Sequence, residues 1–492
     1  MHKPSILFSL GLVAALTSGC TDPAPSSAGA SGPLAGKPVV IILFDAFSAK
    51  HVSHLGYGKQ TTPNLDQLAA EGTTFENAFS PTPYTLASIP SLLTGRLPDR
   101  HGVTQAEHIL PEHEITLAEL LAERNYQTFN ALANIQGGAL HKLEQGFEIY
   151  EELFRGSDDP KGAIDIVEPT AFPEVLERWQ ASRDVERPPL YYLHVLQPHM
   201  PYDPPTETLA GLVNPNYDGP FKDGITKEWM VDFTMKGGQA IIGEGPNRIS
   251  KADARHVRGL YDGSIVECDR VLGEIVAGLK KSGVYDDALI IVTSDHGEAM
   301  WQHNVLGHSS TVFDEMMHVP LVVKLPKDME SPVKRVSNIT SLMDIMPSIC
   351  AWMDVPAPRD LDGEPFAQLI NESPDEDRRL LMRTYHRDPV IASRSAKDKI
   401  ISSPGGAGQP RNARHFDIAQ DKAEKRGQKV LPETPEHALA LQLEADFEAL
   451  WALDAGTVTD QEQSAAEIKA LAELGYTDNE NVEAEPAQDP DK

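Results

Sequence analysis

The sequence is short of positive charge. Lys and Arg number 43 against 73 Asp and Glu, which gives the 492 residues a formal net charge of -30. A protein that binds nucleic acid needs a basic surface to meet the phosphates, so this balance argues against DNA or RNA as a partner. Diffuse acidity indicates solubility and says little about the fold.

Cysteine is also scarce, with three in the whole chain. Cys20 follows a short apolar stretch at the N-terminus, whereas Cys268 and Cys350 each lie in an apolar pattern of helical period. Buried free thiols behave as small apolar side chains in such patterns. We therefore expect Cys268 and Cys350 to be buried and free, with a single disulfide between them as the alternative.

Long apolar runs are missing too, apart from one at the start of the chain. Residues 1–19 combine a basic start, an apolar stretch too short to span a bilayer and small residues, which is typical of a signal peptide. The following Cys20 resembles the lipidated Cys of a bacterial lipobox, although Thr17 stands where that pattern usually has Leu. We expect a lipoprotein anchored in the bacterial cell envelope, on the periplasmic or outer-surface side. The alternatives are ordinary secretion and an uncleaved anchor.

Continuous apolar runs that end in polar side chains indicate a central parallel sheet. The run in "KPVVIILFDAF" ends at Asp45, the run in "PPLYYLHVLQPHMPY" ends near His199, and "DDALIIVTSDHGE" ends at Asp295 and His296. Helical patterns lie between them, which predicts an α/β fold with a doubly wound, mostly parallel sheet. Ligands bind beyond the carboxyl ends of the strands in such sheets, so these side chains are expected to share one site.

Composition and pattern divide the chain into five parts. After the signal peptide, residues 20–37 are rich in Pro, Ser, Gly and Ala and predict a flexible tether. Residues 38–355 carry the α/β pattern, and residues 356–476 alternate like antiparallel strands, which predicts a smaller C-terminal α+β subdomain. The acidic tail 477–492 is expected to be disordered.

Four segments together resemble the sulfatase family of the alkaline phosphatase superfamily. They are "IILFDAF", "HLGYGKQTTPNLDQLAAEGTTFENAFSPTPYTLASIPSLLTGRLPDRHGV", "HVLQPHMPYDPP" and "VTSDHGEAMWQHNVLGHSSTVFDEMMHVPLVV". The resemblance extends from about Val39 to Glu424. It implies an alkaline-phosphatase-like fold and a metal-dependent hydrolase of sulfuric or phosphoric esters.

One segment departs from the family pattern. Working sulfatases carry C/S-x-P-x-R before "SLLTG", and its first residue is oxidised to formylglycine, but here Thr85, Ala87 and Ile89 take the three marked positions. Formylglycine cannot form from Thr85. A sulfated Thr lacks the second hydroxyl that expels sulfate, whereas a phosphorylated Thr can be cleared by water, so the resemblance implies phosphate or phosphodiester chemistry with Thr85 as nucleophile.

The helix expected after Thr85 supports this role. Proline is tolerated in the first turn of a helix, so Pro90 predicts a helix that begins near Ser88 and stops at Gly95. Thr85 would then lie just ahead of a helix N-terminus, which suits a tetrahedral anion. The alternative is that Thr85 is one more polar turn residue in a dead site.

A metal ion is the expected activator of the Thr85 hydroxyl. Asp45, Asp295 and His296 occupy the positions that bind metal in the family, and with Thr85 they offer four ligands. Two carboxylates, one imidazole and one hydroxyl suit Zn²⁺ or Mn²⁺, while Ca²⁺, the usual sulfatase ion, prefers oxygen ligands throughout. The first strand end lacks a second acid, which argues for one divalent ion.

Three further histidines match substrate-side positions of the family. His308 and His303 lie where the family places a Lys or His that contacts the leaving oxygen or the anion, and His199 matches a substrate-side His. An imidazole suits a general acid near neutral pH.

The leading interpretation is an ester hydrolase that acts on a phosphorylated or sulfated small molecule, glycan or lipid. The alternative is an inactive, sulfatase-like envelope lipoprotein that binds anionic glycans or serves as a scaffold.

Overall fold

A computed structural model describes most of the chain. The described residues are 32–156, 164–166, 169–225, 229, 241–242, 248–329, 331–369, 375, 377–385, 389–403, 411–454 and 459–460. The expected signal peptide, Cys20, most of the tether and the acidic tail lie outside them. No helix of the described residues is long and apolar enough to cross a membrane.

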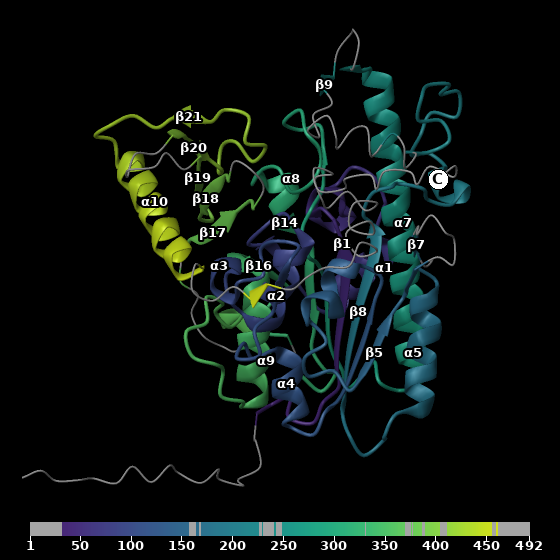
Figure 1. The fold of residues 1–492 in the computed structure, drawn as a ribbon. Coiled ribbons are helices and arrows are strands. Elements are labelled where there is room, and N and C mark those ends of the chain that lie inside the picture. The colour runs from purple at the N-terminus through teal and green to yellow at the C-terminus, as the bar shows by residue number, and fades with distance from the viewer. Residues whose placement is uncertain are drawn as a thin grey trace, which may run out of the picture.

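The central feature is a nine-stranded sheet (Figure 1). Its strand order is β14-β2-β15-β11-β1-β8-β4-β5. Strands β14 and β15 both pair with β2 in the antiparallel sense, at opposite ends of β2, and β16 pairs with β2 in parallel. The strands are β1 (Val39–Asp45), β2 (Thr73–Phe79), β4 (Gln127–Leu132), β5 (Ile149–Glu152), β8 (Pro189–Pro198), β11 (Leu289–Ser294), β14 (His318–Val319), β15 (Leu321–Lys324) and β16 (Arg335–Ser341). The five strands from β11 to β5 are parallel, whereas β15 runs antiparallel to β11. The expected mostly parallel sheet is confirmed.

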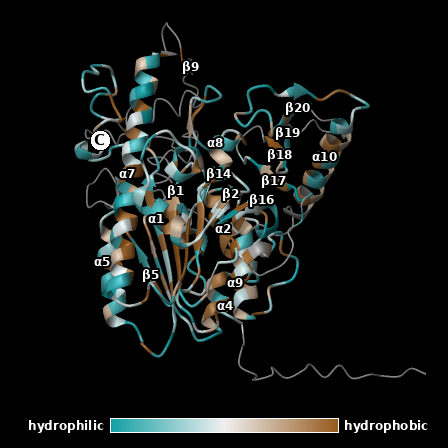
Figure 2. Ribbon diagram, turned by 180° about the vertical axis from the view of Figure 1, so that it is seen from behind, coloured by the Kyte–Doolittle hydropathy of each residue, from teal (hydrophilic) through white to brown (hydrophobic). Residues whose placement is uncertain are grey.

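Helices cover both faces of this sheet, so its strands are buried on both sides. The first face packs against α1 (Pro63–Glu71), α5 (Ala171–Ser182) and α7 (Lys251–Lys281). The second face packs against α2 (Thr85–Thr94), α4 (Leu117–Ala122) and α9 (Ile345–Met353). The strands are correspondingly apolar and the long α7 carries hydrophilic residues on its outer side (Figure 2). Cys268 in α7 and Cys350 in α9 are free and buried, as predicted.

The C-terminal part forms a separate antiparallel sheet. Its strands, in order, are β17 (Leu380–Arg383), β18 (Ile391–Arg394), β19 (Asp398–Ser403), β20 (Arg411–Asp417) and β21 (Gln428–Lys429). Helix α10 (Pro435–Asp454) packs on one side of this sheet through Ala440, Leu443 and Phe447. The other side meets the edge of the main sheet through Phe79 and Ile339. The expected smaller α+β subdomain is therefore present.

Short elements complete the described chain. The helical ones are η1 (Ala49–His51), η2 (Ser53–Leu55), α3 (Pro98–His101), η3 (Ile135–Gly137), η4 (Ala139–His141), η5 (Thr206–Leu209), α8 (Asp314–Met317), η6 (Leu342–Asp344) and η7 (Ala367–Leu369). The extended ones are β3 (His108–Ile109), β6 (Phe154–Gly156), β7 (Ile164–Ile166), β9 (Ile241–Ile242), β10 (Arg248–Ile249), β12 (Ala299–Met300), β13 (Leu306–Gly307) and β22 (Thr459–Asp460).

Candidate active site

Three polar side chains project from one face of three adjacent parallel strands. Side chains alternate between the faces of a strand. Asp45 continues the face of β1 that carries Ile41 and Leu43, and the same face carries His194 of β8 and Asp295 just after β11. The register places Leu43 beside His194. Polar groups from segments 250 residues apart in sequence therefore meet at the carboxyl edge of the sheet.

Helix α2 covers the same face, and its first residue is Thr85. The expectation that the helix begins near Ser88 is wrong: Tyr84 is the N-cap, Pro90 lies inside the helix, and Gly95 ends it in a left-handed conformation as expected. All ten helical residues are buried, so packing compensates for the backbone hydrogen bond that Pro90 forgoes. Thr85 is thus part of the first turn, where backbone N–H groups lack acceptors within the helix.

Contrary to the prediction from the sequence, Ser88 does not cap the helix but bonds to a neighbouring segment. Its hydroxyl donates to the backbone carbonyl of Asp295 at 2.6 Å and contacts the hydroxyl of Ser80. This bond ties the first turn of α2 to the end of β11. The nucleophile candidate and the acid after β11 are therefore held by one short connection.

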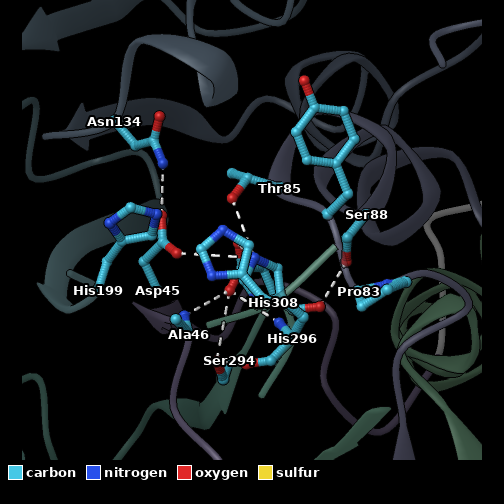
Figure 3. A network of polar contacts seen from close by, with 12 residues as sticks. Asp45, Ala46, Pro83, Thr85, Ser88, Asn134, His199, Ser294, His296 and His308 are labelled. Atoms are coloured by element: carbon cyan, nitrogen blue, oxygen red, sulfur yellow. Dashed lines mark hydrogen bonds and ion pairs between the residues drawn. The ribbon is translucent and has the colours of Figure 1, made fainter. Parts of the chain in front are cut away.

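Thr85, Asp45 and His296 lie close together (Figure 3), and Asp295 contacts His296 at the same ring nitrogen through its carboxylate. Nε2 of His296 lies 3.2 Å from the Thr85 hydroxyl, 3.5 Å from Oδ2 of Asp295 and 3.8 Å from Oδ1 of Asp45. Nδ1 of His296 lies 2.9 Å from the carbonyl of Gly297, to which it can donate. That bond sets the tautomer in which Nε2 carries a lone pair toward the other three side chains.

Each carboxylate has one anchored oxygen and one that points into the site. Oδ1 of Asp295 accepts from the backbone N–H groups of Ala46 and His296, at 3.0 and 2.8 Å. Oδ2 of Asp45 accepts from the amide of Asn134. Within the described chain, Oδ1 of Asp45 and Oδ2 of Asp295 have no hydrogen-bond partner, although both residues are fully buried.

A divalent cation fits this donor set. Two buried, unpartnered carboxylate oxygens cost free energy that a cation would offset. In a tetrahedral zinc site with bonds of about 2.0 Å, the ligand atoms lie about 3.3 Å apart. The distances around Nε2 of His296 are close to that spacing. Thr85, Asp45, Asp295 and His296 are therefore suited to hold the ion that the resemblance implies.

His194 is a site residue that sequence reasoning missed. It is fully buried, its Nε2 lies 3.6 Å from Oδ2 of Asp45, and neither ring nitrogen has a hydrogen-bond partner in the described chain. Asp45, His194 and Asp295 each offer a ligand atom within 4.8 Å of the others. A Cβ at Gly137 would lie 2.9 Å from Nδ1, so Gly137 backs the ring on that side. The polar residue in the middle of an apolar strand was the available signal.

The charges of the site shift the pKa values of its members. Burial opposes ionisation of Asp45, yet the neighbouring His199, His194 and His296 hold the pKa of Asp45 well below its usual range. Burial likewise opposes protonation of His296, but Asp295 and Asp45 raise the pKa of His296 above its ordinary value. The acids and the imidazole thus stabilise one another's charged forms.

Two of the three predicted histidines border this cluster. His199 lies beside Asp45 (Figure 3), and its pKa is lowered chiefly by burial. The ring of His308 lies 4.8 Å from that of His199 and 4.5 Å from that of His296, between centroids. Nδ1 of His308 lies 3.1 Å from the carboxylate of Glu298, a buried acid that sequence reasoning did not single out. Burial raises the pKa of Glu298 to about 7.

His303, the third histidine, makes its contacts elsewhere. Its Nδ1 lies 2.5 Å from Glu315, its Nε2 lies 3.0 Å from the carbonyl of Glu424, and its ring stacks on Phe313. Strands β12 and β13 form a hairpin, with Ala299 opposite Gly307. His303 lies in the turn of this hairpin and His308 just beyond its open end. The structure therefore brings His308, but not His303, to the cluster around Thr85.

Comparison with known proteins places this site in a family. A profile described as Sulfatase matches residues 37–355. The multifunctional alkaline phosphatase superfamily protein PehA of Trinickia caryophylli is 26% identical over 406 residues, which cover 70% of this chain and 79% of PehA. An ulvan-active sulfatase of Formosa agariphila is also 26% identical, over 371 residues that cover 70% of this chain and 67% of the relative.

Solved structures agree on the fold. The phosphonate monoester hydrolase of Agrobacterium radiobacter superposes with a TM-score of 0.66 at 22% sequence identity, and the match covers 87% of this chain and 100% of that one. The matched profile spans more than half of the chain and contains every residue of the cluster around Thr85. The chain therefore belongs to the sulfatase family.

Proposed function

We propose that the protein is a metal-dependent phosphoester hydrolase in which Thr85 is the nucleophile. The observation that carries the proposal is the position of the Thr85 hydroxyl, 3.2 Å from Nε2 of His296 and in the first turn of a buried helix. Two orphaned carboxylate oxygens, from Asp45 and Asp295, face the same point. An abandoned site would have no physical need for such a costly cluster.

The metal ion would be held by Asp45, Asp295, His296 and Thr85. When bound, it would lower the pKa of the Thr85 hydroxyl and neutralise charge on the ester. His194 adds an imidazole beside Asp45. A donor set with one or two imidazoles suits Zn²⁺ or Mn²⁺ better than Ca²⁺.

The residues of the chain account for both halves of the reaction. The Thr85 hydroxyl gives up its proton to solvent, its oxygen attacks phosphorus, the P–O bond to the leaving group breaks, and protonated His308 donates a proton to the departing oxygen. Water then gives a proton to the neutral His308 and attacks phosphorus, which breaks the bond to the Thr85 oxygen and releases phosphate from a monoester or a phosphate monoester from a diester. The Thr85 oxygen regains its proton from solvent. Backbone N–H groups in the first turn of α2 favour the anion throughout. The same water step at a sulfated Thr would be slow, which favours phosphate or phosphodiester substrates over sulfate esters.

The natural substrate is proposed only as a class. The relatives favour an anionic ester on a small molecule, a glycan or a lipid; one relative is named as active on ulvan. The N-terminal pattern that ends in Cys20 supports an anchor in the bacterial envelope.

The first experiment is metal removal and restoration. Purified protein is stripped with a chelator, reloaded with Zn²⁺, Mn²⁺ or Ca²⁺, and assayed on bis-p-nitrophenyl phosphate, p-nitrophenyl phosphate and p-nitrophenyl sulfate. We expect phosphodiester turnover to return with Zn²⁺ or Mn²⁺ and to fall at least about 10³-fold in Thr85→Ala. Ser91→Ala, a second buried hydroxyl in α2 that bonds within its own helix and to His101, is the matched control.

Three results would contradict the proposal. Turnover of the sulfate ester alone would contradict the proposal that the substrate is a phosphoester. Full activity of Thr85→Ala would show that Thr85 is not the nucleophile. If no metal binds and no ester turns over, a binding protein with a relict site becomes the better interpretation.

A further inference from the structure

Glu298 is a buried acid that the proposed mechanism does not use. Its side chain is fully buried, and the hydroxyl of Tyr202 lies beside its carboxylate. Oε1 lies 3.1 Å from Nδ1 of His308. A carboxylate in such a place costs free energy unless its interactions compensate for the lost hydration. The contact with His308 is therefore the feature to explain.

The hairpin β12–β13 fixes this contact. Ala299 pairs with Gly307, and Met300 pairs with Leu306. Glu298 precedes β12 and His308 follows β13, so the antiparallel register sets the two residues opposite each other at the open end. The backbone thereby delivers the acid to the histidine, whereas the turn at the other end carries His303 away.

We propose that Glu298 is a positioning residue that accepts a hydrogen bond from Nδ1–H of His308 and thereby directs Nε2 of that ring toward the ester. The inference rests on the proton-donor role proposed above for His308. Nδ1 and Nε2 lie on opposite sides of an imidazole, so a bond at one nitrogen orients the other. A buried acid behind a catalytic histidine acts in the same way in serine hydrolases. Glu298 itself touches neither the ester nor Thr85; it fixes the tautomer and the direction from which the proton reaches the leaving oxygen.

The kinetic test compares two leaving groups on the same phosphodiester. p-Nitrophenolate leaves without a proton, whereas phenolate needs one from Nε2 of His308. We expect Glu298→Gln to lower kcat for the phenyl ester at least about 10-fold more than kcat for the p-nitrophenyl ester, with KM for both nearly unchanged. His308→Gln should show the same ratio, and the double variant should be no worse than His308→Gln alone.

A matched pair in the same segment separates positioning from mere stability. Glu315 contacts Nδ1 of His303 as Glu298 contacts Nδ1 of His308, and Glu315 is equally buried. Glu315→Gln removes a buried acid from a histidine outside the cluster, so the ratio between the two leaving groups should stay as in the parent. A ratio that shifts equally in Glu315→Gln, or an additive double variant, would overturn the inference.

A second readout does not depend on turnover. In ¹⁵N NMR of the metal-loaded protein at pH 8.5, with the His308 signals assigned by their loss in His308→Gln, Nδ1 should be the protonated nitrogen. Glu298→Gln should shift that proton toward Nε2, because the Gln amide can donate to Nδ1. A parent protein with the proton on Nε2 would overturn the inference. Absent turnover of every ester would instead contradict the proposed function and leave the tautomer as the test of Glu298.

Discussion

The side chains that gather around Thr85 are each held by a second residue. Asn134 donates to Asp45, the Ala46 amide donates to Asp295, and the Gly297 carbonyl faces Nδ1 of His296. Such supporting bonds orient the ligands of a metal site, and the bond from Nδ1 of His296 also raises the basicity of its Nε2. His194 is different because its two ring nitrogens have no such partner in the described chain.

The position of His194 predicts that this residue contributes to the choice of metal ion. His194→Gln should weaken the binding of Zn²⁺ or Mn²⁺ about 10- to 100-fold, because an imidazole next to Asp45 is lost. Binding of Ca²⁺ should change less than about 3-fold, since Ca²⁺ makes little use of nitrogen ligands. Competition with a chromophoric chelator measures all three affinities.

His256→Gln is the control for that experiment. His256, in α7, is also buried, and its two ring nitrogens also lack hydrogen-bond partners among the described residues. Its ring stacks on that of Tyr217, with 3.9 Å between the ring centroids. It should leave every metal affinity unchanged. An equal loss in both variants would attribute the effect to general loosening of the fold and exclude His194 as a contributor.

Sequence predicted Asp45, Thr85, Asp295 and His296 because each follows a recognisable pattern or family position. His194 and Glu298 escaped for physical reasons. A polar residue within an apolar strand reveals its purpose only when the neighbouring strands are known. Glu298 acquires its partner through the pairing of two short strands, each of two residues. Both residues can be recognised only from the three-dimensional neighbours that the fold gives them.

Helix α2 shows how tertiary packing overrides local preference. Proline disfavours a helical residue before it and removes a backbone donor, which predicted a start near Ser88. The helix instead begins three residues earlier, because all ten of its residues are buried against the sheet and its neighbours. The prediction of its end at Gly95 held because a positive φ, here 71°, is a local property that glycine satisfies.

The hairpin turn and α8 are linked by the His303–Glu315 pair, whose strength depends on pH. Burial lowers the pKa of His303, but Glu315 and then Glu424 raise it to a net value above the ordinary one. A raised pKa means that the stabilisation is complete below about pH 6.5 and is lost as the pH rises through the shifted value. The free energy of unfolding of the parent protein should therefore exceed that of the His303→Gln variant, and the margin between the two should shrink between pH 6 and pH 9.

Urea unfolding at several pH values measures this margin. His113→Gln, in which the side chain lost is 66% exposed, is the control and should follow the parent at every pH. A margin for His303→Gln that grows with pH would contradict the assignment of the pair.

The two sheets are joined by a buried ionic cluster. Nζ of Lys399 in β19 lies 2.8 Å from Asp314 in α8 and 2.8 Å from Glu424, and all three side chains are buried. Arg394 adds a second cation beside Asp314. The sequence showed the antiparallel pattern of this region but could not show which charges would cross to the main domain, since such pairs depend on docking.

Lys399→Met should destabilise the protein strongly. It leaves two buried carboxylates with one fewer cation, which costs about 3–5 kcal/mol in comparable pairs. Lys397→Met removes an exposed charge two residues away and should change the free energy of unfolding by less than about 0.5 kcal/mol. Chemical denaturation followed by fluorescence compares the two, and equal effects would contradict the importance of the cluster.

The central strand β1 lies between β8 and β11, and both neighbours come much later in the chain. During synthesis at about 5–20 residues per second, Asp45 waits on the order of tens of seconds for Asp295 to be made. The neighbour β8 is made first, and β11 and Asp295 follow about a hundred residues later. A truncated product that ends before Asp295 therefore cannot assemble the ligand set, and a metal ion could be bound by all the proposed ligands only after more than half of the chain has been synthesised.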